Sequence, residues 1–486
     1  MTYYETINKF FQIGLSLTYI VLGLCMIKFL VAILVFFSLA FLANANIDDK
    51  GVQALLDGDY ETAYNELMPL AERDHPRSLY NIAYMYFHGL GLKQNRDEAF
   101  KFYKKATENG FPLAFHQIGF YYDNGLLGEV NVQEAVKWYE KAAEKGVLVS
   151  YHNLGFIYDT GRLTGKKDYV QAAQWYKYSA ERGYANSQVN LGMLYDDGLG
   201  VIQDDKEAVR LFTLASNQGS PNGMWRLALM HIYGEGVMQD NKKGLELITK
   251  AAELNLPEAQ HDIGLIYEDG QLGVKPDKSI AAQWYRRAAE LGYADSQVNL
   301  GILYDNGDGV PLNDEEAFKW FTLAANQNQP LGQYYLGTMY EFGEGIAQNF
   351  EEAGSWYSTA CDNSNEPNSC FRLGFLFENG SLKSDNPFLV PSLYQKAAEA
   401  GNVESQFRLG TILYFGELNG LIDKVQAYMM FNIAGMNGHE TAIENRDVMV
   451  GELTSAELEK GQSLSKQCLE KILKDCICWD CLQSSN

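Results

Sequence analysis

The sequence is short of positive charge. It holds 39 Lys and Arg residues against 62 Asp and Glu residues, which gives a formal net charge of −23. Binding to nucleic acid needs clustered cations that neutralise phosphates, and anionic membrane surfaces attract the same groups. The composition therefore argues against nucleic acid as a partner, and it leaves residues 10–43 as the one segment suited to membrane contact.

Sequence motifs of common enzymes are also missing. The chain has no G-x-S-x-G, no H-E-x-x-H and no phosphate-binding loop. We therefore predict a protein that is not an enzyme and that needs neither a cofactor nor a metal. Few stretches favour β-strands, so the expected fold class is all-α.

Tandem repetition is what the sequence has in place of these motifs. "SQVNLGMLYDDGLGV" from Ser187 and "SQVNLGILYDNGDGV" from Ser296 differ at three of fifteen positions. A small residue in an "LG"-like dipeptide recurs every 36 or 37 residues, at Ala83, Gly119, Gly155, Gly192, Ala228, Gly264, Gly301, Gly337, Gly374 and Gly410. A fixed period of this length indicates a stacked array of small repeats.

Each period is predicted to form two short helices. The first begins at a small residue, numbered position 1 below, and ends near a glycine at position 12, which suits a left-handed helix cap. Apolar residues at positions 5, 8 and 9 have helical spacing. The second helix carries an aromatic residue followed by a pair of small residues, as in "WYEKAAEKG" from Trp138.

Position 6 is glycine in eight of ten repeats, although it lies in the middle of the first helix. Glycine there costs about 0.8–1 kcal/mol relative to alanine, and eight such sites cost about 6–8 kcal/mol, which approaches the stability of a whole domain. We expect close approach of a neighbouring helix to offset this cost. The small pair would supply a flat surface, and the aromatics Tyr139, Tyr176, Tyr285 and Tyr357 would fill the space beside it.

The pattern A-x-x-x-L-G-x-x-Y-x-x-G-x-G-V, followed by A-x-x-W-Y-x-x-A-A-x-x-G, resembles the Sel-1-like repeat, a relative of the tetratricopeptide repeat. The resemblance implies a right-handed α-solenoid of ten helix-turn-helix repeats over residues 78–441. Residues 46–77 would form an N-terminal half-repeat cap with a lone second helix, and residues 442–486 a capping helix and a cysteine-rich tail. Ala83, Ala228, His231 and Ile248 depart from the pattern.

Residues 1–45 form a leader outside the array. The apolar stretch is interrupted by Lys28, and each half is shorter than the roughly 20 residues that span a bilayer. Read from Met26, the segment has a basic start, an apolar core and a small-x-small site, which predicts an export signal cleaved after Ala45. Residues 1–25 are then a mis-assigned start or an extension, and the alternative is a retained inner-membrane anchor. Both place the repeats outside the cytoplasm, in a bacterial periplasm or beyond.

Cysteine usage agrees with export. Cys25 belongs to the leader, and an even six remain. Cys361 and Cys370 flank the link between two repeats, and their spacing resembles the disulfide-bearing, cysteine-rich subset of Sel-1-like proteins. We expect a disulfide there. Cys468, Cys476, Cys478 and Cys481 cluster in the tail, where we favour two disulfides over a zinc site.

The concave wall of the solenoid is the predicted binding surface. Helical rotation places positions 3, 4, 7, 10 and 11 of the first helices on one side. An aromatic and apolar ribbon edged by acids at position 10 would suit a protein or peptide with apolar anchors and basic flanks, although many of these residues could instead pack between repeats. The predicted partner-binding residues are Tyr80, Tyr84, His116, Phe120, His152, Phe156, Asn190, Met193, Trp225, His261, Val298, Tyr334, Phe371, Phe375 and Phe407.

The favoured function is a non-enzymatic exported scaffold. One alternative is a β-lactamase-like or peptidoglycan-binding protein, because some cysteine-rich relatives carry such labels. "SLSK" at Ser463 and "SDN" at Ser384 resemble two motifs of that chemistry, but their order is reversed and K-T-G is absent. The other alternative is a secreted, host-directed effector, which the leader permits.

Overall fold

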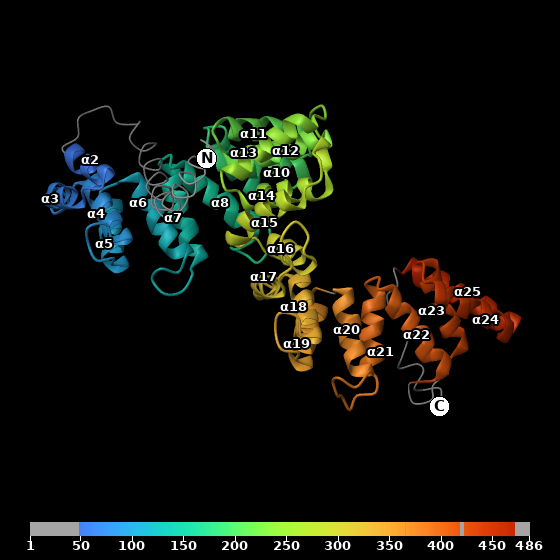
Figure 1. Cartoon of the computed structure of the whole chain (residues 1–486). Helices are drawn as coiled ribbons and strands as arrows, with labels where there is room; N and C mark the ends of the chain where they lie inside the picture. The colour runs from blue at the N-terminus through green and yellow to red at the C-terminus, as the bar shows by residue number, and fades with distance from the viewer. Residues whose placement is uncertain (1–47, 365, 418–421, 472–486) are drawn as a thin grey trace, which may run out of the picture. The chain divides into compact units, whose positions relative to one another are not determined.

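The computed structural model describes residues 48–364, 366–417 and 422–471, so the predicted leader lies outside the described residues. The described chain is built from α-helices with one 3₁₀ turn and contains no strand, which confirms the all-α prediction (Figure 1). The helices are α2 Asp49–Asp57, α3 Tyr60–Ala71, α4 Pro76–His88, α5 Arg96–Glu108, α6 Pro112–Asp123, α7 Val132–Glu144, α8 Leu148–Thr160, α9 Tyr169–Ala180, α10 Ala185–Asp197, α11 Asp205–Asn217, α12 Pro221–Tyr233, α13 Asn241–Glu253, α14 Pro257–Asp269, η1 Gln271–Gly273, α15 Lys278–Glu290, α16 Ala294–Asn306, α17 Asp314–Asn326, α18 Pro330–Phe342, α19 Phe350–Ser364, α20 Pro367–Glu378, α21 Leu389–Glu399, α22 Val403–Phe415, α23 Lys424–Met436, α24 Glu440–Glu452 and α25 Ser455–Glu470.

The helices pack in sequential pairs, as the repeat pattern predicts. The first helices of the ten repeats are the even-numbered helices from α4 to α22. Each packs against the helix that follows it in the chain. The chain divides into two compact units between Ala215 and Ser216, within α11. Within each unit, successive pairs stack side by side and form the α-solenoid architecture (Figure 1).

Local sequence sets where each helix begins and ends. Several first helices start with proline, as α4 does at Pro76, where the missing N–H costs nothing. They end at the predicted glycine in the left-handed region, as at Gly198, with φ of 66°, and Gly307, with φ of 70°. Most second helices begin after Asp or Asn, whose side chain accepts a hydrogen bond from the first turn, as Asn313 does from the N–H of Glu316; α21, which follows Phe388, is an exception.

An aromatic ring contacts the glycine at position 6. A Cβ added to Gly119 would lie 2.6 Å from the Tyr139 ring, and one added to Gly301 would lie 2.5 Å from the Phe321 ring. These rings come from the second helix of the same repeat and are fully buried. The predicted close approach is therefore confirmed, but its partner is the ring and not the small pair.

The pair of small residues on the second helix instead contacts the first helix of the next repeat. A Cβ on Gly332, at position 1, would lie 2.6 Å from the Cβ of Ala324 in the preceding second helix. At another junction the Ser179 hydroxyl donates to Ser187 Oγ at 2.6 Å. Small residues at both places thus let adjoining repeats approach closely.

Two departures from the repeat pattern occur in the same repeat. Ala228 stands at the glycine position of its repeat, and Ile248 stands where the ring of the second helix is expected. Both side chains are buried, with exposed fractions of 0% and 1%. Repeat 1 also has alanine at this position, Ala83, but there it occurs together with a buried ring, Tyr103, so alanine does not require the loss of the ring.

The two ends of the array differ from the prediction in one respect. The N-terminal cap contains two helices, α2 and α3, where the sequence suggested a lone second helix. Gly51 of α2 lies against Leu67 of α3, which reproduces the glycine contact with a leucine in place of the ring. At the other end, the predicted capping helix is α25, which starts with a capping box between Thr454 and Glu457 and packs against α23.

No helix in the described part of the chain is both long enough and apolar enough to cross a bilayer.

Candidate functional site

The histidines at position 3 connect neighbouring repeats. Nδ1 of His116 lies 3.0 Å from Ser150 Oγ, that of His152 lies 3.2 Å from Ser187 Oγ, and that of His261 lies 2.9 Å from Ser296 Oγ. Each serine occupies position 1 of the next repeat. Burial lowers the pKa of His116 and of His152 to about 4, so these imidazoles are neutral at pH 7.

Other position-3 residues pack within their own repeat or against the next one. Val298 is 1% exposed and belongs to the core. Trp225 is half-buried, and its Nε1 donates to Asp262 of the next repeat at 2.7 Å. Four half-buried aromatics rest on the ring of their own second helix, with centroid distances of 5.4 to 6.0 Å: Tyr80 on Tyr103, Tyr334 on Tyr357, Phe371 on Tyr394 and Phe407 on Phe431. Val298 and His116, which is 9% exposed, therefore offer almost no surface to a partner.

Most of the acids at position 10 accept a hydrogen bond from the core tyrosine of their own repeat. The Tyr285 hydroxyl donates to Glu268 at 2.7 Å and that of Tyr357 to Glu341 at 2.8 Å. Tyr139 with Asp123, Tyr176 with Asp159 and Tyr394 with Glu378 form the same pair. Burial, followed by the nearby carboxylate, raises the pKa of Tyr357 far above its ordinary value.

Position 4 of the next repeat completes this arrangement. Arg372 donates through Nε to Glu341 at 3.0 Å, and Arg408 forms an ion pair with Glu378. Asn153, Asn190 and Asn299 make side-chain hydrogen bonds to Tyr139, Tyr176 and Tyr285, respectively. The half-buried amide of Asn190, which we expected to bind a partner, is therefore used between repeats.

The exposed strip of the first helices runs through positions 7 and 11. Phe156 and Phe375, both at position 7, are 45% and 37% exposed. Tyr84, Phe120 and Met193 at the same position are half-buried. One helical turn later, Tyr233, Phe342 and Phe415 at position 11 are 67%, 55% and 64% exposed. We call positions 7 and 11 the first-helix strip.

Position 11 was in the predicted set, but its exposed aromatics were not singled out. The sequence could have indicated this exposure. An apolar residue directly before the glycine that ends a helix is not covered by a further helical turn. Arg372 lies between two of these rings, with Cζ 5.1 Å from the centroid of Phe342 and 5.6 Å from that of Phe375. A guanidinium between rings keeps the apolar surface in a fixed orientation.

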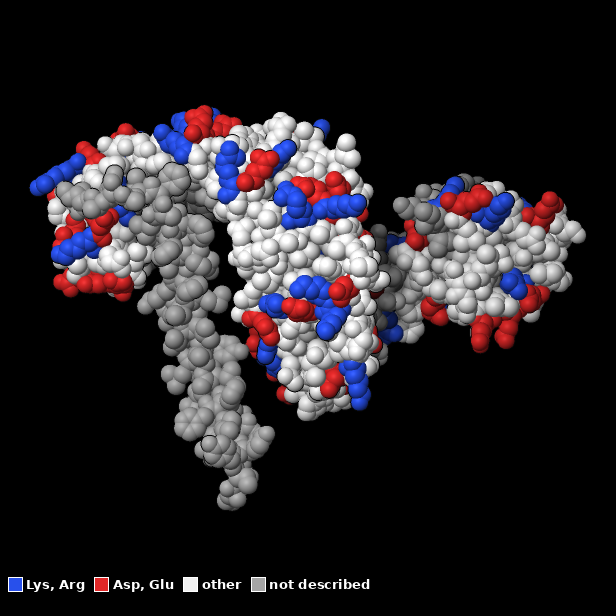
Figure 2. All heavy atoms as spheres, turned by 90° about the horizontal axis from the view of Figure 1, so that it is seen from above, with Lys and Arg blue, Asp and Glu red and all other residues white. Residues whose placement is uncertain are grey.

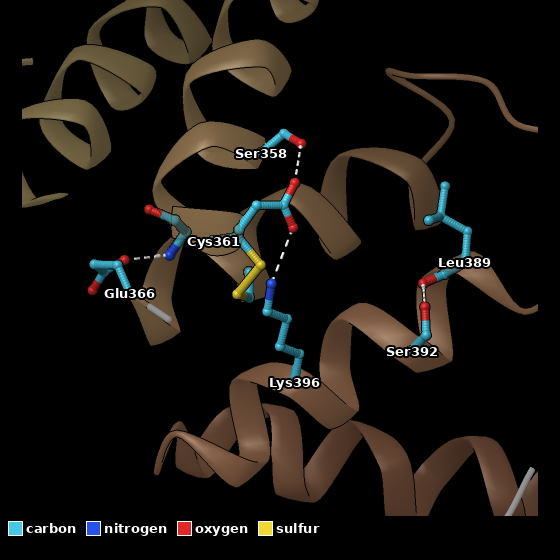
Figure 3. The surroundings of a disulfide bond; sticks show 9 residues. Ser358, Cys361, Glu366, Leu389, Ser392 and Lys396 are labelled. Carbon is cyan, nitrogen blue, oxygen red and sulfur yellow. Dashed lines mark hydrogen bonds and ion pairs between the residues drawn. A yellow bond between two sulfur atoms is a disulfide. The ribbon is translucent and has the colours of Figure 1, made fainter. Parts of the chain in front are cut away.

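The predicted disulfide between Cys361 and Cys370 is present, with both residues fully buried (Figure 3). It joins the end of α19 to the start of α20. Beside it, Lys396 of α21 forms an ion pair with Asp362 at 3.0 Å. Cys468 is buried in the C-terminal core, whereas Cys476, Cys478 and Cys481 lie outside the described residues, so the tail disulfides stay a prediction. Over the described ranges no group of His, Cys, Asp and Glu side chains is arranged to hold a metal.

Charge is mixed over the surface. Figure 2 shows basic and acidic side chains interspersed on the face seen from above, with wide uncharged areas between them. A strip of exposed apolar side chains on stacked helical pairs is suited to gripping another polypeptide. Fold and surface together define a helical-repeat scaffold.

Comparison with known proteins gives the family. The Sel1 repeat profile matches residues 76–111, 113–147, 148–184, 185–220, 221–256, 257–293, 294–329, 330–365, 367–388, 392–402 and 403–439, which is more than half of the chain. The chain therefore belongs to the Sel1 repeat family. The profile finds eleven segments where we predicted ten repeats, because 367–388 and 392–402 share the pair formed by α20 and α21.

The chain is similar to several solved structures. The chain is 32% identical, with a TM-score of 0.60, to c5321, a protective antigen of uropathogenic Escherichia coli with an SLR fold; the match covers 87% of this chain and 90% of that one. A Sel1 repeat protein from Oxalobacter formigenes is 27% identical over 70% of this chain and 98% of its own, with a TM-score of 0.49. Cysteine-rich protein B of Helicobacter pylori is 25% identical over 27% of this chain and 93% of its own, with a TM-score of 0.23. No curated protein matches the sequence.

Proposed function

We propose that this chain is an exported, non-enzymatic scaffold that binds a protein or peptide partner along the first-helix strip. Sel1 repeat proteins are generally non-catalytic and bind proteins. The observation that carries the proposal is the exposure of aromatic side chains at positions 7 and 11, whereas side chains at positions 3, 4 and 10 make contacts within their own repeat or with the adjoining repeat. Exposed aromatic side chains are costly to leave in water and are enriched at protein-binding surfaces.

Export to a bacterial periplasm or beyond, by cleavage after Ala45 or with the leader kept as an anchor, is the second part of the proposal. The disulfide between Cys361 and Cys370 supports it, because such bonds persist in oxidising compartments. Secretion of an epitope-tagged full-length chain, followed by sequencing of its mature N-terminus, tests this part. A mature chain that starts at Asn46, or a membrane-bound chain whose repeats lie outside the cytoplasm, is the expected result. Repeats that stay in the cytoplasm would contradict export.

Site-specific photo-crosslinking tests the binding surface. A photoreactive phenylalanine analogue replaces Phe156 or Phe375 in the strip, and, as matched controls, Leu254 or Leu291, which are 47% and 53% exposed where their second helices end. We expect a discrete adduct from the two strip positions and none from the two leucines. Equal labelling at all four positions, or adducts at the leucines alone, would overturn the proposed surface.

A further inference from the structure

Three acidic side chains in repeats 7 and 8 stand without a partner. Asp305 lies at position 10 of α16, Asp314 is the first residue of α17, and Glu344 follows α18. None of the three has an ion-pair or hydrogen-bond partner among the residues that the structure describes. All three belong to the second unit.

Asp305 does not accept the hydrogen bond that its equivalents in other repeats accept. In five other repeats the position-10 carboxylate accepts a hydrogen bond from the core tyrosine. Repeat 7 has Phe321 at that place, and Phe321 has no hydroxyl to donate. Tyr335 occupies the following position 4 and stacks on Phe321 at 4.9 Å instead of reaching the carboxylate. Asp305 therefore accepts no hydrogen bond from the second helix of its own repeat.

Asp314 and Glu344 are two acids at places where the preceding repeat has a lysine and an acid. One repeat earlier, Lys278, the first residue of α15, forms an ion pair with Asp308, 30 residues further on. Asp314 and Glu344 occupy the same two places with the same spacing. Backbone contact at both junctions confirms the equivalence, because a Cβ on Gly309 would collide with Lys278, and one on Gly345 with Asp314.

The three carboxylates are close enough to repel one another. Burial and then Asp314 raise the pKa of Asp305, whereas burial followed by Asp305 and Asp314 raises that of Glu344. A lysine at residue 314 would relieve this repulsion, as Lys278 does one repeat earlier. Within the described residues no Lys or Arg forms an ion pair with any of these three carboxylates, although Asp314 lies in the first turn of α17, where the helix dipole favours a negative charge.

Exposed apolar side chains border the same acids. Leu312, Phe342 and Ile346 are 64%, 55% and 37% exposed. Each lies two residues along the chain from Asp314 or Glu344. Phe342 belongs to the first-helix strip, so the acidic cluster adjoins the proposed binding surface.

We propose that Asp305, Asp314 and Glu344, together with Leu312, Phe342 and Ile346, form a docking site for a basic segment of a protein partner. The segment carries lysine or arginine next to a large apolar residue. Charge complementarity selects this occupant, because a cation placed among the three carboxylates removes their repulsion while the apolar neighbour covers the exposed rim. This inference rests on the proposed function and specifies the partner's chemistry.

Fluorescence anisotropy with two labelled peptides tests the site on the full-length protein. One peptide alternates lysine and leucine, and the other carries glutamate in place of each lysine. Asp314→Lys rebuilds the ion pair seen between Lys278 and Asp308, and Glu315→Lys makes the same charge change at the adjacent exposed residue of α17. We expect the lysine peptide to bind, Asp314→Lys to weaken its binding at least tenfold, and Glu315→Lys to change it less than twofold.

Thermal unfolding accompanies the binding measurement, and Asp314→Lys should melt at or above the temperature of the wild type. Failure of the lysine peptide to bind, equal weakening by both substitutions, or equal binding of the glutamate peptide would overturn the site. The crosslinking at Phe156 and Phe375 is unaffected by these results, so loss of the acidic site and loss of the proposed function are told apart.

Discussion

Cys370 forms its disulfide with Cys361 at the place where other repeats use a hydrogen bond. Gln333 Nε2 donates to the carbonyl oxygen of Ala325 at 3.4 Å, and Gln188, Gln260, Gln297 and Gln406 make the same bond to their preceding second helix. Cys370 stands at the glutamine position and Cys361 at the alanine position, at a sequence separation of nine instead of eight. The covalent bond thus replaces a repeated polar contact where the link is one residue longer.

This relationship predicts a graded loss of stability. Cys361→Ala with Cys370→Gln should restore the hydrogen bond and lose about 1–2 kcal/mol, because a short disulfide loop contributes about 2–3 kcal/mol and the hydrogen bond returns about 1 kcal/mol. Cys361→Ala with Cys370→Ala, which lacks both, should lose more. Urea unfolding under oxidising conditions measures the difference, and equal stability of the two variants would contradict the replacement.

The buried histidines predict acid sensitivity. Burial lowers the pKa of His152 to about 4, so the folded state keeps this imidazole neutral while the unfolded chain takes up a proton near pH 6.5. Stability from His152 is therefore present above pH 6.5 and is lost as the pH falls towards 4, at about 1.4 kcal/mol per pH unit.

His152→Phe removes this titration and copies Phe371 and Phe407, which occupy the same position in repeats 9 and 10. Urea unfolding between pH 7 and pH 4 should show a shallower decline for the variant. Asp159 and Glu344, whose pKa values are raised, titrate with the opposite sign in both proteins and cancel in the comparison. Parallel curves would show that His152 takes up its proton at the same pH in the folded and unfolded states, and would contradict a lowered pKa.

Exposure predicts which substitutions separate binding from folding. Phe156→Ser and Phe375→Ser should leave the melting temperature within about 2 °C, because exposed substitutions usually change stability by less than about 0.5 kcal/mol, and they should weaken partner capture. Trp225→Ala should instead destabilise the protein, since Trp225 donates to Asp262 across a repeat junction. A large drop in melting temperature for the serine variants would place Phe156 and Phe375 in the core.

The repeat period, the glycines that end the first helices and the pairing of helices could be predicted from the sequence, because each depends on local chemistry. Glycine at position 12 ends a first helix, and the ring follows the position-6 glycine after 20 or 21 residues, as in the pairs Gly119 with Tyr139 and Gly155 with Tyr176. The outward face could not be assigned so well. Rotation by 100° per residue places Val298 and Ile302 on the same side of α16, yet the former is buried by the next repeat and the latter is half-buried. The place where a neighbouring pair docks decides this, and it depends on the stack and not on a single helix.

The position-6 contact is the central physical claim, because it fixes how each pair closes and which side remains free. Gly301→Ala gains about 1 kcal/mol of helix propensity but forces a Cβ to 2.5 Å from the Phe321 ring, and overpacking of this kind costs about 1–3 kcal/mol. Phe321→Ile copies the Ala228 and Ile248 pair of repeat 5.

A double-mutant cycle on Gly301→Ala and Phe321→Ile, measured by urea unfolding, is the most direct test. We predict that the double variant is more stable than the sum of the single losses allows, by at least about 1 kcal/mol. Additive losses would mean that the residue at 301 and the side chain at 321 do not compete for the same space, and would contradict the account.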